Sequence, residues 1–139
     1  MIKELVKDEE LLSTPCEPAT ADDAEVAQDL LDTLESIEDA ACLAANQIGV
    51  TKALIVYKDD KNRAHVMYNP AMQRALHPAR LEEGCLTREG MTKVTRYDQA
   101  TFTYQELVDG KLIPRRKECR GWTAEILQYM IDHCTGKLI

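Results

Sequence analysis

The stretch QYMIDH, from Gln128 to His133, lies in a segment whose apolar residues recur at the spacing of an α-helix. One face of this helix would carry Trp122, Ile126, Leu127, Met130, Ile131 and Cys134. Gly136 follows at the position where a glycine ends many helices. We therefore predict a C-terminal helix from about residue 123 to residue 134, with Trp122 packed at its start.

Strand-forming segments precede this helix. Runs rich in β-branched and aromatic residues cover residues 53–57 and 65–68, and the dipeptide Asn69-Pro70 closes the second run. Further runs cover residues 94–97 and 100–104, and another, 111–113, follows the turn signal Asp109-Gly110. The pattern predicts a hairpin or two neighbouring strands first, and then more strands of a mostly antiparallel sheet.

The N-terminal part of the chain predicts a second helix. Pro15 and Pro18 indicate that the segment from Ile2 to Cys16 is an extended surface lead-in. Thr20 then begins a helix, because Asp23 three residues later completes the pattern of a capping box. Apolar residues follow at helical spacing: Val26, Leu30, Leu31, Leu34 and Ile37. The predicted fold class is therefore α+β, with a long N-terminal helix and the C-terminal helix packed on the sheet.

Length and composition limit the classes of function. The 139 residues, 45% of them apolar, predict a single domain over residues 1–139. A formal net charge of −7 argues against nucleic acid as a partner. No apolar run is long enough to span a membrane, so we expect a soluble, cytoplasmic protein without a membrane partner. Five cysteines without a CxxC pair favour a reducing compartment. The composition gives no prediction of the oligomeric state.

Two further stretches stand out beside QYMIDH: CLAANQIG at residues 42–49 and EEGCLT at residues 82–87. In order and spacing, the three resemble the signature motifs of the peptide deformylase family, whose forms are GxGLAAxQ, EGCLS and QHExDH. The flanking segments also look like this family, so the resemblance covers essentially the whole chain. It implies the peptide deformylase fold and the family activity, which is metal-dependent removal of the formyl group from N-formylmethionyl peptides.

The resemblance also implies roles for individual residues. Family members bind a divalent metal, usually iron, through one Cys and two His, and a bound water attacks the formyl carbon. By resemblance, Cys85 and His133 would be metal ligands. Gln47 and the backbone N–H of Leu86 would stabilise the developing oxyanion. Cys42, Leu43 and Gly84 would lie along the substrate groove.

The third motif departs from the family pattern at two positions. Tyr129 stands where the family has the first His ligand, and Met130 stands where it has the general-base Glu. A phenol with an ordinary pKa of about 10 is a poor ligand for a divalent ion at neutral pH. Loss of a general base typically lowers a rate by about 10² to 10⁴. The sequence therefore predicts a deformylase homologue with impaired catalysis, which binds iron, zinc or nickel weakly or binds no metal. Ala40 and Cys42 replace the glycines of the first motif and crowd a loop that approaches substrate.

Three functional hypotheses remain open at this point. In the first, Cys85 and His133 still hold a metal, with Tyr129 or water, and hydrolyse formyl-peptides slowly. In the second, the protein is a non-catalytic module that binds a formyl-methionyl or similar peptide, or a protein, beside Gly84. In the third, Cys85 is a free nucleophile with His133 as its partner. Each residue taken singly also has a structural interpretation. Cys85 could be a buried structural thiol, His133 could be a core histidine, and Gln47 could hydrogen-bond to the backbone of a loop.

Overall fold

The computed structural model describes residues 1–85 and 88–137, with the side chains of Cys85, Arg88 and Glu89 excepted. In chain order the elements are α1 (Glu9–Leu12), the 3₁₀ turn η1 (Ala21–Asp23), α2 (Ala24–Ser36), β1 (Cys42–Ala44), the 3₁₀ turn η2 (Ala45–Ile48), β2 (Leu54–Lys58), β3 (Ala64–Cys85), β4 (Arg88–Val108), β5 (Lys111–Arg120) and α3 (Gly121–Cys134). No helix in these ranges has the length and apolar character needed to cross a membrane.

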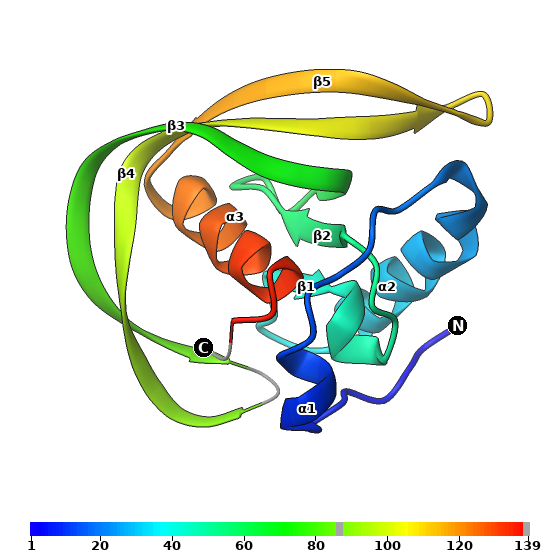
Figure 1. Cartoon of the computed structure of the whole chain (residues 1–139), viewed down its shortest axis with the longest axis horizontal. Coiled ribbons are helices and arrows are strands. Elements are labelled where there is room, and N and C mark those ends of the chain that lie inside the picture. The colour runs from blue at the N-terminus through cyan, green and yellow to red at the C-terminus, as the bar shows by residue number, and fades with distance from the viewer. Residues whose placement is uncertain (86–87, 138–139) are drawn as a thin grey trace.

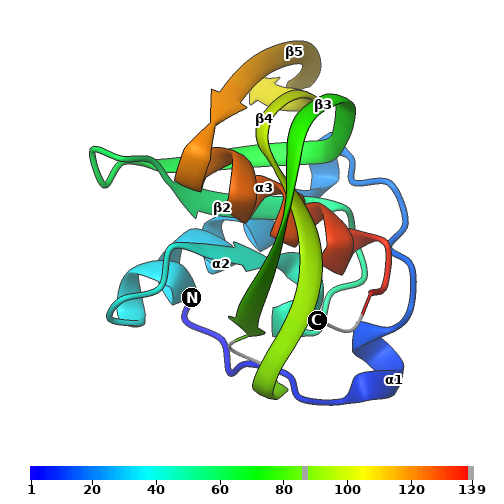
Figure 2. The ribbon, with the colours of Figure 1, turned by 90° about the vertical axis from the view of Figure 1, so that its left-hand side faces the viewer.

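The sheet is antiparallel, as the sequence predicts, and its strands lie in the order β1-β2-β3-β4-β5. β3 and β4 are much longer than their neighbours and pair with each other from Tyr68 and Gln105 to Cys85 and Arg88. Both bend away from the rest of the sheet and curve around α3 (Figures 1 and 2). Their far ends therefore return to the helix that carries the third motif.

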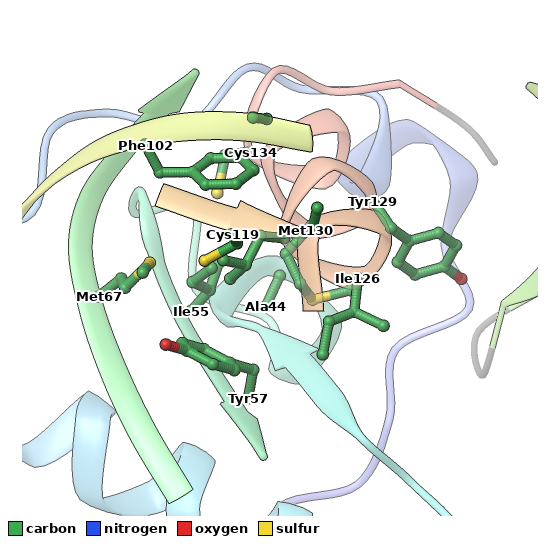
Figure 3. Packing of buried hydrophobic residues seen from close by; sticks show 13 residues of the cluster. Ala44, Ile55, Tyr57, Met67, Phe102, Cys119, Ile126, Tyr129, Met130 and Cys134 are labelled. Atoms are coloured by element: carbon green, nitrogen blue, oxygen red, sulfur yellow. The ribbon is translucent and has the colours of Figure 1, made fainter. Parts of the chain in front are cut away.

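Strand β2 is buried on both faces, because one helix packs on each side of the sheet there. Ile55 and Tyr57 pack in a cluster with Leu127 and Met130 of α3, part of which Figure 3 shows. Leu54 and Val56, which alternate with them, pack in a second cluster with Leu30 and Leu34 of α2. A run of apolar residues without polar alternation is what a strand between two helices requires.

The N-terminal segment differs in part from the prediction. Thr20 and Asp23 form the predicted capping box, and the α-helix α2 then runs for 13 residues. This is an ordinary length, so the expectation of a long N-terminal helix is not confirmed. The lead-in from Ile2 to Cys16 is also not wholly extended, because it contains the single turn α1. The Asp8 side chain accepts the N–H of Glu10 to cap this turn, and Leu12 is buried.

The sequence predicts the end of a strand at Asn69-Pro70, and this prediction is wrong. β3 continues through the dipeptide, with a shift of register between Tyr68 and Ala71 and another between Met72 and Arg74. Asn69 has a φ of 53° and donates its side-chain amide to the carbonyl of Ala19 and to Oε1 of Gln105. These bonds hold a bend that lets the strand change direction and continue. The predicted turn at Asp109-Gly110 is confirmed, with both residues at positive φ.

α3 matches the predicted helix except at its first turn. Gly136 follows the helix with a φ of 83°, as predicted. Trp122 does not pack in the core, since 59% of it is exposed. The prediction for this side chain is wrong because helical spacing places a residue on one face of a helix but does not determine whether another element covers it there.

Candidate functional site

The three motifs meet where the end of β3 returns to α3. A pocket of about 280 Å³ lies there, lined by Cys42, Glu82, Glu83, Gly84, Trp122, Glu125, Ile126 and Tyr129; we call it the α3 pocket. A larger pocket of about 420 Å³ lies between α2 and the sheet, but none of the predicted site residues lines it. The α3 pocket is therefore the candidate site, because it joins residues from all three motifs.

Tyr129 links α3 to β3. Its hydroxyl donates a hydrogen bond of 2.8 Å to the carbonyl oxygen of Gly84. Its ring meets His133 edge-on, with 5.1 Å between ring centroids, and the Arg96 guanidinium lies 6.0 Å from the centre of the ring. In Figure 3 the ring points away from Met130 and the rest of the cluster. Tyr129 thus lies at the site while its hydroxyl serves as a donor to backbone.

Met130 lies in the hydrophobic core. Only 1% of it is exposed, and it packs in the cluster with Ala44, Ile55 and Ile126. A thioether carries no proton to give and has no basic group. The position where the family has its general base is therefore filled by a core side chain.

His133 and Gln47 are both held in the interior beside the site. His133 is 1% exposed, and its backbone carbonyl accepts a hydrogen bond of 2.9 Å from the Asn46 amide. Gln47 is also 1% exposed, and its Oε1 accepts the N–H of Ala44 at 3.0 Å. This hydrogen bond fixes the orientation of the Gln47 amide, in which Oε1 is the acceptor and Nε2 is the donor. Gly49 ends η2 with a φ of 90°, which fixes where the motif turns.

Of the remaining predicted site residues, some line the α3 pocket and others do not. Cys42 and Gly84 line the α3 pocket as expected. Leu43 is fully buried in the cluster on the α2 side and does not line the pocket. Leu86 and the side chain of Cys85 lie outside the described residues; the backbone of Cys85 is the last position of β3.

An ion-pair network behind the pocket was missed by the sequence analysis. Arg96 on β4 donates from Nε and Nη2 to the Glu83 carboxylate, with its shortest distance 2.7 Å, and from Nη1 to Asp132 at 2.6 Å. Arg96 is 5% exposed. The network ties β3, β4 and α3 together beside Gly84. Glu83 and Asp132 lie within the motifs, but nothing in the sequence around Arg96 marks it as their partner.

Glu125 is a second residue that the sequence analysis missed. It lies one helical turn before Tyr129, on the same side of α3, and lines the α3 pocket. Burial raises the pKa of its carboxyl, and the nearby Glu83 raises it further. Helical spacing from Tyr129 was the available signal for this residue.

The described residues do not fit the metal site that the family motifs imply. A catalytic site built from one cysteine and two histidines needs all three protein ligands, each with its lone pair free of a proton. Tyr129 holds its proton in the bond to Gly84, and Met130 is in the core. Within the described part of the chain, no group of three His, Cys, Asp or Glu side chains could hold a metal ion. Even with Cys85 added, the positions given by the motifs supply only Cys85 and His133.

Comparison with known proteins gives consistent results. The family model described as polypeptide deformylase matches residues 2–139. A peptide deformylase of Clostridium beijerinckii is 37% identical over 140 residues, covering 100% of both chains. Among solved structures, a peptide deformylase from Legionella pneumophila is 30% identical, with a TM-score of 0.85 over 99% of this chain and 83% of that chain. A Met-Ala-Ser-bound peptide deformylase from Acinetobacter baumannii has the same fold, with a TM-score of 0.85, 22% identity and coverage of 99% and 97%.

Proposed function

The chain belongs to the polypeptide deformylase family, and on this premise we propose that it keeps the family's peptide groove without metal-dependent deformylation. The observation that carries the proposal is the hydrogen bond of 2.8 Å from the Tyr129 hydroxyl to the Gly84 carbonyl. It gives the residue at the first His position a structural role that competes with metal binding. The protein is then a non-catalytic, cytoplasmic binder of a formyl-methionyl or similar peptide N-terminus.

The chemistry of Tyr129 supports this proposal. A phenol must lose its proton to act as a good metal ligand, and it would then lose the bond that it donates to Gly84. A phenolate beside a backbone carbonyl would also place two acceptors against each other. The ring contacts with His133 and Arg96 further restrain it. Ligation by Tyr129 would therefore require the end of β3 to move.

The environment of Met130 supports the loss of catalysis independently of the metal. The side chain lies among apolar residues of the core, so no water beside it could be activated by this position. Without a general base, the rate would fall by about 10² to 10⁴. Both departures affect the attack of water on the formyl carbon.

The retained parts of the site support peptide binding. Gln47 is buried and oriented by Ala44, which keeps an amide donor near the motif helix. Cys42 and Gly84 line an open pocket. The Acinetobacter baumannii deformylase of the same fold is known with the tripeptide Met-Ala-Ser bound. A groove of this shape can hold a peptide without any reaction following.

Turnover of formyl-Met-Ala-Ser by protein loaded with ferrous ion under anaerobic conditions tests the loss of activity. We expect no turnover above the free-metal control, and no stoichiometric iron, zinc or nickel in the purified protein. Turnover at an ordinary enzyme rate would contradict the proposal. Tyr129→Phe is the matched control, since it removes the hydroxyl without supplying a ligand, and it should stay inactive.

The double variant Tyr129→His/Met130→Glu tests whether the scaffold is still competent. Recovery of turnover would show that Gln47, Cys85 and His133 remain correctly placed. The residues at positions 129 and 130 would then account for the loss of activity. Calorimetry with the same peptide tests the binding role in the natural protein. Absence of binding heat at millimolar concentration, with this peptide and with formyl-peptides that carry other first residues, would remove that role.

A further inference from the structure

The α3 pocket is acidic, and this determines which peptide side chain it can accept. Three carboxylates line it: Glu82, Glu83 and Glu125. Arg96 neutralises Glu83 from behind the pocket and also binds Asp132, so its charge is already shared between two carboxylates. Among the described side chains, neither Glu82 nor Glu125 forms an ion pair with a cation. The pocket therefore has an excess of negative charge.

Glu125 is placed to contact a side chain inside the pocket. Trp122, Glu125 and Tyr129 follow one another along α3 at spacings of three and four residues, so they form one wall. Glu82 and Gly84 of β3 line the pocket with them. The bond from Tyr129 to Gly84 joins the two walls beside Glu125.

Trp122 adds a second feature that suits a cation. It lines the α3 pocket although 59% of it is exposed. A single exposed apolar side chain is ordinary on a protein surface, but this indole borders a pocket that carries three carboxylates. An indole in such a place binds ammonium and guanidinium groups through its ring face. The carboxylates and the ring therefore favour the same class of ligand group.

The acidic surface continues beyond Trp122. A neighbouring hollow of about 440 Å³ shares Trp122 with the α3 pocket and is lined by Glu35, Glu38, Asp39 and Asp59 together with Lys58. Lys58 pairs with Glu35 at 3.8 Å, and Asp59 pairs with His65 at 2.7 Å. Glu38 and Asp39 therefore extend the negative field into the hollow that adjoins the α3 pocket at Trp122.

From these observations we propose that the α3 pocket takes the positively charged side chain of a lysine or arginine at the first residue of the bound peptide, and that Glu125 selects it. This inference rests on the proposed peptide-binding function and names the class of peptide. A methionine side chain would remove water from the Glu125 carboxylate without replacing its hydrogen bonds, which is unfavourable. A cation would replace them with a charge-assisted contact.

Calorimetry with formyl-Lys-Ala-Ser, formyl-Met-Ala-Ser and formyl-Glu-Ala-Ser amides tests the selection. We expect the lysine peptide to bind about tenfold more tightly than the methionine peptide, as one charge-assisted contact allows, and the glutamate peptide to bind most weakly. Higher ionic strength should reduce the preference for lysine. Equal or tighter binding of the methionine peptide would overturn this inference and leave the proposed function standing. Failure of all three peptides to bind at millimolar concentration would overturn both.

The isosteric variant Glu125→Gln assigns the selection to one residue. Its preference for the lysine peptide should fall to within about threefold, whereas Glu125→Asp should retain part of the preference. Glu25→Gln is the matched control, because Glu25 is an exposed residue of α2 outside the pocket and its replacement changes the net charge equally. An unchanged preference in Glu125→Gln, with normal circular dichroism, would overturn the assignment.

Discussion

The hydroxyl of Tyr129 on α3 donates a hydrogen bond of 2.8 Å to the carbonyl oxygen of Gly84 near the end of β3. It joins two motif segments that lie 45 residues apart in the sequence. Tyr129→Phe should therefore lower the free energy of unfolding by about 1 kcal/mol, the usual net value of such a bond. Urea denaturation measures the change. Tyr104→Phe is the control, since the structure gives the Tyr104 hydroxyl no hydrogen bond to the described residues, and it should change stability little.

Arg96 should contribute far more to stability than an exposed arginine. Its guanidinium is buried between Glu83 and Asp132, and Arg96→Gln would leave Glu83 without its cation and Asp132 with only Lys137, at 3.8 Å. We expect a loss of roughly 3 to 5 kcal/mol in the free energy of unfolding. Arg115→Gln breaks the exposed pair with Glu106 and should cost less than about 1 kcal/mol. Similar losses in the two variants would contradict the structural role of Arg96.

Gly136 should tolerate alanine less well than Gly110. Both have positive φ, but a Cβ on Gly136 would lie 2.6 Å from the Ser13 carbonyl oxygen, whereas a Cβ on Gly110 would meet open space. Gly110→Ala should lose roughly 1 to 2 kcal/mol from backbone strain alone. Gly136→Ala should lose a further 1 to 3 kcal/mol, on the order of other overpacked sites. Thermal unfolding of the two variants provides the comparison, and equal losses would mean that Ser13 does not pack there.

Asp59 should make stability depend on pH in acid. The contact with His65 Nε2 at 2.7 Å, with backbone N–H groups of Arg63 and Lys61, lowers the pKa of Asp59 to about 2. A carboxyl with a depressed pKa stabilises the fold above its unfolded pKa of about 4, and this contribution is lost as the pH falls through the folded value. Asp59→Asn should therefore melt below the natural protein at pH 6, and the difference should narrow between about pH 4 and pH 2. Asp60→Asn, at an exposed neighbour, removes the same charge and is the matched control.

Cys134 should resist alkylation in the folded protein. Burial raises the pKa of its thiol to about 12, so almost no reactive thiolate forms near pH 8. Iodoacetamide should label the partly exposed Cys16 and Cys42 before Cys134, as mass spectrometry of proteolytic fragments would show. In urea all three should react at similar rates. Early labelling of Cys134 under native conditions would mean that α3 opens readily from the core.

Features that depend on neighbouring residues in the sequence could be predicted from the sequence alone. The spacing of apolar residues indicated α2 and α3, the Thr20–Asp23 pattern indicated the capping box, and Asp109-Gly110 indicated the turn between β4 and β5. Each depends on residues a few positions apart, whose backbone preferences act whatever the rest of the chain does. The three linked motifs likewise indicated the family, which the comparisons confirm.

Only the tertiary structure decided which contacts form between segments that lie far apart in the sequence. The bend at Asn69 depends on Ala19 and Gln105, and the pairing of Arg96 with Glu83 and Asp132 depends on how β3 and β4 curve around α3. The same holds for Glu125 in the α3 pocket. Trp122 belongs to the apolar stripe of α3, yet 59% of it is exposed. The sequence determined the two main helices, the capping box and the turn at Asp109-Gly110, and it determined the loss of the His and Glu side chains from the third motif. The packing of distant segments determined that Tyr129 binds Gly84 and Met130 joins the core, because these contacts exist only where surfaces far apart in the chain meet.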